Sequence, residues 1–260
     1  MISIKTEREI KLMRQSGRLL AELMQILVRE VKPGLFTIEL ENLANRFIKK
    51  HKVKPAFKGF PSNRKGTISY PAILCTSCNE EVVHAIPSNR QIKSGDIITI
   101  DAGLNFKGYF SDMAVSVPVG KVSHKAKHLL ETTKNALYLA IGKVKEGVYL
   151  GDISSAIERY VRKNNCYILK ELSGHGIGRS LHEPPNVLNY GSPKTGPVLK
   201  AGMCLAIEPL VSLSTERIKT LKDGWTIVTA DSSLSAHFEH TILVTKKGAE
   251  ILTQCPNFNK

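Results

Sequence analysis

The sequence predicts an α+β fold of two similar halves, each with outer helices that precede a mostly antiparallel sheet. Two observations support it: helical periodicity appears twice, each time ahead of strand-like sequence, and a segment of the first half aligns without gaps with one of the second. With 260 residues, 42% of them hydrophobic, the chain can bury a large core. We therefore expect one domain over residues 1–260, with pseudo-repeats of about 1–120 and 121–260.

The first half opens with two amphipathic helices. Apolar residues recur at helical spacing from Thr6 to Val31, and Thr6 with Glu9 forms a capping box at the start. The pair Pro33-Gly34 ends this pattern, and a second helix is predicted from Thr37 to His51. Strands and turns are expected from there to about residue 119.

The pattern restarts in the second half, with helices expected over Ser123–Val144 and Asp152–Arg162. VKPGLFTIELENLANRFIKK (31–50) aligns with VKEGVYLGDISSAIERYVRK (144–163) at a constant offset of 113 positions. Two unrelated amphipathic helices can agree by chance. The matched turn glycines, Gly34 and Gly147, make an internal duplication the better interpretation.

Composition narrows the class of protein. The net charge of +14 predicts attraction to polyanions such as RNA, although a solvated basic face explains it equally well and no aromatic-interleaved RNA-binding motif is present. No apolar run approaches the roughly 18 residues of a membrane helix, and the N-terminus lacks a signal core. The five cysteines are odd in number and lie in apolar segments. We expect a cytoplasmic protein with free thiols and no membrane association.

Two aspartates interrupt the apolar stretch ITIDAGLNFKGYFSDMAVSV (98–117). If strands Ile97–Ala102 and Tyr109–Val117 form a hairpin symmetric about residues 106 and 107, Asp101 lies directly opposite Asp112, with Cβ atoms roughly 4.5 to 5.5 Å apart. Two buried carboxylates repel each other, so a proton or a cation is needed between them. A three-residue loop or a bulge would shift this pairing.

The second half supplies complementary groups. Glu208 and Glu239 lie in apolar strand-like runs, and His175 is flanked by glycines in GHGIGRSLHEPPN. Each residue alone is more often a hydrogen-bonded structural group, but together they predict a metal site. Four carboxylates with an imidazole suit Mn, Fe(II), Co or Zn, and can hold two ions roughly 3.5 to 4 Å apart. No G-x-S-x-G nucleophile motif is present, and Cys75-x-x-Cys78 lacks a second pair for zinc.

NEEVVHAIP, IDAG, SDMA, SGHGIGRSLHEPP, AIEP, DGWT and FEHTILV occur in this order. With them the chain resembles the bacterial type I methionine aminopeptidases over nearly its full length. The resemblance implies a pita-bread fold, a single catalytic domain, and removal of N-terminal methionine from peptides and nascent chains whose second residue is small. It also implies that two divalent metal ions are held by five residues: Asp101, Asp112, His175, Glu208 and Glu239.

The resemblance further assigns roles. Asp101 would chelate one ion, Asp112 and Glu239 would bridge both, and His175 with Glu208 would complete the second. A water shared by the ions would lose its proton to Glu208 and attack the peptide carbonyl. His182 would stabilise the oxyanion and His84 would contact the peptide nitrogen, unless both are merely polar core histidines. The methionine pocket would be lined by Cys75, His84, Leu181, Trp225 and an aromatic residue at Phe57, Phe60 or Tyr70.

Three features depart from the resembled pattern: an apparent insertion at residues 61–69, Leu181 where many relatives carry an aromatic residue, and His237 where glutamine is common. Strand alternation places His237 on the same side as Glu239. One alternative function is an X-Pro aminopeptidase or prolidase, whose chains usually carry an extra N-terminal domain. Another is an inactive relative that binds RNA or ribosomes. We expect a monomeric enzyme whose basic surface docks on ribosomal RNA.

Overall fold

The computed structural model describes residues 2–62 and 66–254. Its helices are α1 (Glu7–Glu30), α2 (Thr37–His51), α3 (His124–Lys143) and α4 (Leu150–Lys163). Its strands, in chain order, are β1 (Lys54–Pro55), β2 (Leu74–Cys78), β3 (Glu81–Val83), β4 (Ile97–Phe106), β5 (Tyr109–Pro118), β6 (Tyr167–Ile168), β7 (Ser173–Gly176), β8 (Glu183–Leu188), β9 (Cys204–Ile207), β10 (Leu210–Ser212), β11 (Ile218–Thr220), β12 (Ile227–Thr229), β13 (Ser235–His237), β14 (His240–Val244) and β15 (Ala249–Ile251). Within the described ranges, none of the helices has the length and apolar character needed to cross a bilayer.

The helices lie where hydrophobic periodicity predicts them. Thr6 caps α1 through the expected box, in which its backbone N–H donates to Glu9 Oε2 at 2.8 Å. The prediction for the fourth helix is short by two residues at its start, because α4 begins at Leu150 after Tyr149. The side chain of Asp152 reaches back to accept from the Tyr149 N–H at 3.3 Å, which satisfies a free donor of the first turn.

The two halves repeat the same local structure at the offset of 113. Phe36 precedes α2 and forms an isolated bridge with Gln91, while Tyr149 precedes α4 and forms one with Val198. The turn glycines Gly34 and Gly147 adopt φ values of 95° and 88°, where L side chains are strained. We propose on this basis that residues 1–120 and 121–260 are pseudo-repeats.

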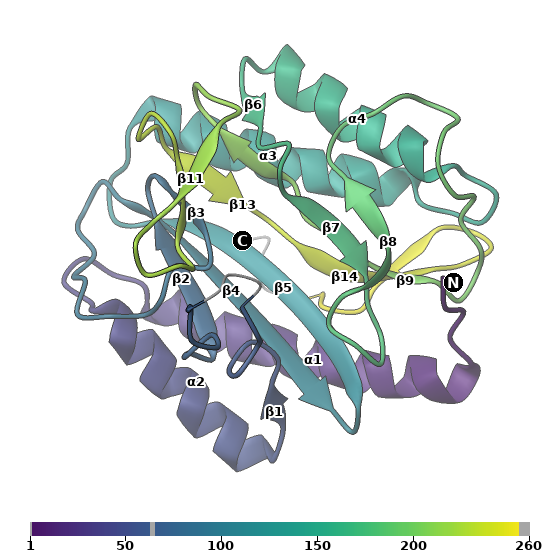
Figure 1. Cartoon of the computed structure of the whole chain (residues 1–260), viewed down its shortest axis with the longest axis horizontal. Coiled ribbons are helices and arrows are strands. Elements are labelled where there is room, and N and C mark those ends of the chain that lie inside the picture. Colours follow the sequence, from purple (N-terminus) through teal and green to yellow (C-terminus); the bar gives the residue numbers. More distant parts are fainter. Residues whose placement is uncertain (1, 63–65, 255–260) are drawn as a thin grey trace.

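All strand pairs within the described residues are antiparallel. The first half contributes a sheet of β1, β4 and β2, with β5 paired to β4, and the second half contributes the order β15-β14-β9-β7-β8. Figure 1 shows α1 and α2 along one margin of these strands and α3 and α4 along the opposite margin. The α+β architecture with outer helices is therefore as predicted.

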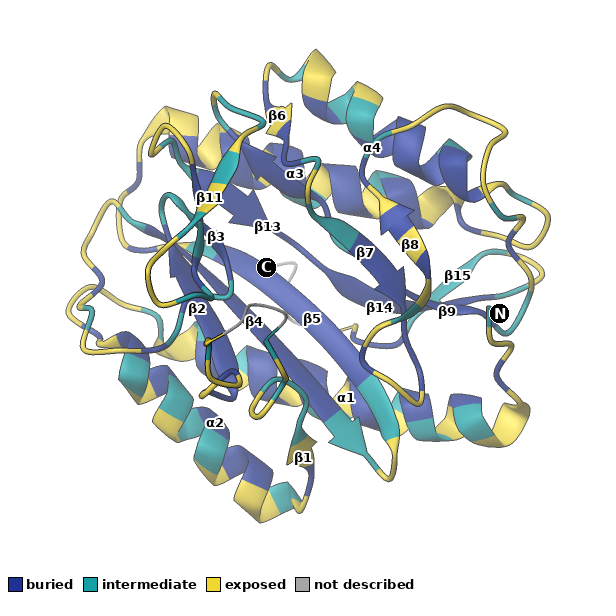
Figure 2. Cartoon of the chain, in the orientation of Figure 1, coloured by how far each residue is buried: buried dark blue, intermediate teal, exposed yellow. Residues whose placement is uncertain are grey.

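Burial follows this arrangement. Figure 2 shows the central strands almost entirely buried, while each helix is buried on the side that faces the strands and exposed on the other. The core includes Leu20, Leu23 and Leu27 of α1, packed with residues of β4 such as Ile98 and Ile100. Polar side chains in the centre of β4 and β5 are consequently shielded from bulk water.

The predicted register of the hairpin is wrong by two positions. Asp101 pairs with Ala114, and Asp112 pairs with Gly103. The turn consists of Lys107 and Gly108, with φ values of 51° and 89°, as a two-residue hairpin turn requires. Because side chains alternate with a period of two, an even shift keeps both aspartates on one face. They are diagonal neighbours, roughly 7 to 8 Å apart, and not directly opposite.

Candidate active site

A cavity of about 570 Å³ lies over this face of the hairpin and is also lined by residues of the second half. The structure brings every residue predicted for the site to its lining: Phe57, Phe60, Tyr70, Cys75, His84, Asp101, Asp112, His175, Leu181, His182, Glu208, Trp225 and Glu239.

The four acidic side chains reach the cavity from different backbone settings. Asp101 lies in β4 and Asp112 in β5, whereas Glu208 directly follows β9 and Glu239 lies between β13 and β14. Asp101, Asp112 and Glu239 are 7%, 4% and 2% exposed. Asp101 Oδ1 and Glu239 Oε1 have no hydrogen-bond partner within the described part of the chain. Such buried acceptors are costly unless a group outside the chain satisfies them.

The carboxylates strongly affect one another. Burial raises the pKa of Asp101 to about 7. Burial, and then the charge of Asp101, raises the pKa of Asp112 well above its ordinary range. Burial and the charge of Asp112 do the same to the pKa of Glu239. Nearby cations would stabilise the ionised form of these acids, which burial and their mutual repulsion oppose.

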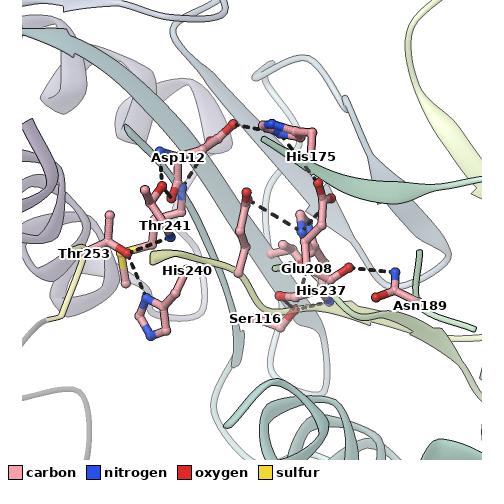
Figure 3. Close-up of polar contacts among 12 residues, drawn as sticks. Asp112, Ser116, His175, Asn189, Glu208, His237, His240, Thr241 and Thr253 are labelled. Atoms are coloured by element: carbon pink, nitrogen blue, oxygen red, sulfur yellow. Dashed lines mark hydrogen bonds and ion pairs between the residues drawn. The ribbon is translucent and has the colours of Figure 1, made fainter. Parts of the chain in front are cut away.

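The donor geometry fits divalent cations. Asp112, His175 and Glu239 offer ligand atoms within 4.8 Å of one another, and Glu208, His237 and Glu239 form a second such group. His175 Nε2 lies 3.9 Å from Asp112 Oδ2 and 3.8 Å from Glu208 Oε1 (Figure 3). Its Nδ1 contacts the Gly176 carbonyl at 2.8 Å, which leaves Nε2 facing the acids, as is usual for a ligating histidine.

Close backbone packing fixes His175 between the acids. A Cβ added to Gly174 would collide with the Ala206 carbonyl, and one added to Gly176 would collide with the Pro184 carbonyl. The glycines that flank His175 in the sequence are therefore required by the approach of β7 to its neighbours.

The second half also anchors Asp112. The Thr241 hydroxyl accepts from the Asp112 N–H at 2.9 Å and donates to the Asp112 carbonyl at 2.8 Å (Figure 3). Thr241 is fully buried, and its own N–H donates to Thr253 Oγ1 at 3.1 Å. A buried hydroxyl thus joins β14 to β5 at the acid cluster.

Two further histidines border the cluster. The His182 ring packs edge-on against His175 with centroids 4.4 Å apart and against Phe60 at 5.2 Å. Enclosure in the cleft and the nearby His175 lower the pKa of His182 to about 4, and burial lowers the pKa of His84. Both rings are thus neutral at neutral pH and can each donate one hydrogen bond and accept another.

The apolar end of the cavity is formed by aromatic residues and Cys75. Tyr70 and Trp225 pack edge-on with centroids 5.1 Å apart. Trp225 Nε1 donates to the Ile68 carbonyl at 3.0 Å, so the predicted insertion at 61–69 supports the Trp225 ring. Phe57, Phe60 and Tyr70 all line the cavity. Residues 63–65 of that insertion lie outside the described residues.

Comparison with known proteins identifies the family. A model of metallopeptidase family M24 matches residues 11–246. The chain belongs to metallopeptidase family M24. "Methionine aminopeptidase 1" of Bacillus subtilis is 46% identical over 254 residues, which cover 98% of this chain and all of that protein. The methionine aminopeptidase of Escherichia coli is 42% identical, over 97% of this chain and 94% of its own length.

Solved M24 structures confirm the pita-bread fold. The crystal structure of methionine aminopeptidase from Thermotoga maritima has a TM-score of 0.94 and 42% identity, covering 98% of this chain and all of that one. A prolidase from Pyrococcus furiosus shares the fold alone, with a TM-score of 0.76, 22% identity, and coverage of 98% of this chain and 66% of its own.

Sequence reasoning missed part of this M24 cleft. Its further lining residues are Val83, Glu171, Leu172, Ser173, Gly174, Asn186, Leu210 and His237. Val83, Ser173, Gly174 and Asn186 lie within the quoted motifs but were not predicted to line the site. Glu171, Leu172 and Leu210 lie outside every motif and reach the cleft through tertiary packing. Strand alternation predicts that His237 lies on the side of Glu239, and its Nε2 lies 3.4 Å from Glu208 Oε2.

Proposed function

We propose that this M24 metallopeptidase is a methionine aminopeptidase that hydrolyses the first peptide bond of chains that begin with methionine and have a small second residue. The observation that carries the proposal is the placement of the carboxylate and imidazole cluster beside an apolar pocket within one cavity. The names and the 41–46% identity of the curated relatives support it.

We propose that five residues that line the cavity are the metal ligands: Asp101, Asp112, His175, Glu208 and Glu239. We propose that they hold two divalent ions, of Co, Mn, Fe(II) or Zn. When bound, such ions lower the pKa of a water molecule and polarise a carbonyl. We propose that Asp112 and Glu239 would serve both ions, as the resemblance implies, and the presence of Glu239 in both groups of neighbouring ligand atoms supports this for Glu239.

The chain's own residues would handle protons and orientation. Glu208 is the most exposed acid of the set, with 13% side-chain exposure, so it can receive the proton of the attacking water. Neutral His182 packs edge-on against His175 and would donate a hydrogen bond to the oxyanion of the tetrahedral intermediate. His84, on the Trp225 side of the cavity, would contact the peptide nitrogen.

The apolar pocket accounts for methionine as the first residue. Cys75, Tyr70 and Trp225 form one side of it, and Leu181 with Phe60 contributes to the lining. Burial raises the pKa of the Cys75 thiol, so this residue stays neutral and suits a thioether. A flexible, polarisable side chain fits such a wall better than a charged one.

The test compares Met-Ala-Ser with an Ala-Pro dipeptide, using apo-enzyme reconstituted separately with Co, Mn, Fe(II) and Zn. We expect metal-dependent release of methionine from Met-Ala-Ser, and much slower release from a matched Met-Leu-Ser peptide. Faster cleavage of Ala-Pro would instead support an X-Pro peptidase, and no cleavage of either peptide with any ion would refute a hydrolase.

We further propose that the enzyme is a cytoplasmic monomer that docks on ribosomal RNA through a basic cluster. Its lysines are exposed around the end of α2, β1 and the following loop, next to Phe57 at the cleft: Lys49, Lys50, Lys52, Lys54 and Lys58. Such binding weakens as salt rises.

Co-sedimentation with ribosomes tests this docking, with analytical ultracentrifugation for the oligomeric state. Reversal of Lys49, Lys50 and Lys54 to glutamate should abolish binding. Reversal of Lys121, Lys125 and Lys127, which are exposed elsewhere, should not. Absence of binding at low salt, or equal loss in both variants, would contradict the docking site.

A further inference from the structure

His237 is held rigidly at the edge of the acid cluster. It ends β13, and its N–H and carbonyl both bond to the Ser116 hydroxyl at 2.9 Å (Figure 3). The side chain is 2% exposed and lines the cavity. Neither ring nitrogen has a hydrogen-bond partner among residues 2–62 and 66–254. An imidazole buried in this way needs a partner that the chain itself does not supply.

The nearest polar atoms to His237 belong to two acids. Its Nε2 lies 3.4 Å from Glu208 Oε2 and 3.8 Å from Glu239 Oε2. Zinc–nitrogen and zinc–oxygen bonds measure about 2.0 to 2.2 Å, so ligand atoms that share one tetrahedral ion lie roughly 3.3 to 3.6 Å apart. The distance from His237 to Glu208 lies within this range, and the distance to Glu239 lies 0.2 Å above it. The three residues form one group whose ligand atoms lie within 4.8 Å of one another, as a shared cation requires.

Glu208 lies between two imidazoles. Its Oε1 is 3.8 Å from His175 Nε2, while its Oε2 is 3.4 Å from His237 Nε2. The two histidines thus approach opposite oxygens of one carboxylate, from β7 and from β13 respectively. Only His175 has an internal acceptor that fixes its other nitrogen.

A nearby histidine shows what a structural role looks like. His240 is three positions further along and is also buried, but its Nδ1 contacts Thr253 Oγ1 at 2.9 Å and its Nε2 contacts Tyr138 Oη at 3.2 Å. Its ring forms no ion pair with the acids of the cluster. A buried histidine of this fold can thus have hydrogen-bond partners at both ring nitrogens, and His237 differs in having none among the described residues.

We propose that His237 is a further metal-ligating residue, which completes a ligand set with Glu208 and Glu239. This inference rests on the proposed metal-dependent function. It makes the centre richer in imidazole, with two histidines around Glu208, and so biases it toward Zn, Co or Fe(II) over Mn.

The experiment titrates the apo-protein with Co(II) and with Mn(II), followed by calorimetry and by visible absorption of Co(II). His237→Gln keeps a neutral side chain of similar reach, and His128→Gln, at an exposed histidine of α3, is the control. We expect His237→Gln to weaken the binding of one Co(II) equivalent by about 10- to 100-fold and to change its absorption bands. Mn(II) affinity should fall less, and the control should bind as wild type.

A second variant covers the case in which His237→Gln fails to fold. His237→Glu offers a carboxylate oxygen at about the same reach as the imidazole Nε2, and the folded variant should bind Co(II) with absorption bands that differ from those of the wild type. Wild-type Co(II) affinity and spectrum in folded His237→Gln or in folded His237→Glu would overturn the proposal. These measurements of metal binding use no peptide substrate. Failure of the wild type to cleave a Met-peptide would therefore refute the proposed function, while the metal titrations would still decide the role of His237.

Discussion

The two halves of the acid cluster are built differently. In the first half, Asp101 and Asp112 project from two continuous strands of ten residues each, paired along their whole length. In the second half, Glu208 follows a four-residue strand, and Glu239 lies in the gap between two short strands. Regular backbone carries the short carboxylates, and irregular backbone carries the long ones.

The two halves therefore position their side chains in different ways. A continuous hairpin fixes the face on which a side chain lies, so short, stiff aspartates can hold fixed positions. Strand ends release the backbone from a strict register, and the longer glutamate and histidine side chains span the remaining distance. The second half also supplies three of the four histidines that line the cavity, His175, His182 and His237.

The hairpin half should be the more sensitive of the two. We expect Asp112→Asn to lower kcat/KM for Met-Ala-Ser by at least about 10³-fold, since a lost metal ligand removes several kcal/mol of transition-state stabilisation. Without metal, the Asp112→Asn variant should unfold at a higher temperature than the metal-free wild type at pH 8. Burial and the charge of Asp101 oppose ionisation of Asp112 and raise its pKa, and a neutral asparagine removes this unfavourable charge. Glu30→Gln, at an exposed acid, is the control. Retained activity would remove Asp112 from the centre.

His182 tests the contribution of the second half to catalysis apart from metal binding. His182→Ala should reduce kcat by about 10²- to 10³-fold, the usual cost of one oxyanion donor. Metal affinity measured by calorimetry should stay near the wild-type value. An equal loss of metal affinity would show instead that the ring acts by holding His175, its neighbour at 4.4 Å.

The sequence predicts which elements form and which acids reach the site better than it predicts how the backbone places them. Helix bounds follow from periodicity and caps, as at Thr6, and acids inside apolar runs reveal the site. The register of the hairpin does not follow, because it depends on whether the turn begins at Phe106 or at Lys107. The cleft wall around Glu171 and Leu172 is also hidden, since tertiary packing alone brings those residues to the cavity.

Thr241 joins the two halves and should have a moderate effect. Thr241→Val keeps the side-chain shape but leaves the buried Asp112 N–H without its acceptor, which should cost about 1 to 3 kcal/mol of unfolding free energy. Metal affinity should also fall, since Asp112 loses its anchor. Thr241→Ser retains the hydroxyl and should restore most of both. Wild-type stability in Thr241→Val would show that water replaces the hydroxyl.

The smallest effect is expected at Glu9, where both halves meet the start of α1. Its carboxylate accepts from the Thr6 N–H at 2.8 Å, from Tyr109 Oη of the hairpin at 3.0 Å, and from Arg179 Nε of the second half at 3.0 Å. The hydrogen bond from Thr6 is the main cause that lowers the pKa of Glu9 to about 2. Glu9→Gln should cost about 1 kcal/mol at pH 7, in the range of a lost helix cap.

The stabilisation that Glu9 contributes to the folded state should decrease as the pH falls. The depressed pKa of Glu9 means that the folded state favours the ionised carboxylate, so the stabilisation is complete above about pH 4.5 and is lost as pH falls toward 2. Urea unfolding at pH 7 and pH 3.5 should therefore show a smaller difference between wild type and Glu9→Gln at the lower pH. The same measurements on Tyr109→Phe and Arg179→Ala separate the contributions of the two other hydrogen bonds of Glu9 to the free energy of unfolding. A larger effect from Tyr109→Phe would show that α1 is fixed mainly by the regular hairpin, and a larger effect from Arg179→Ala would show that the irregular half also holds the helix.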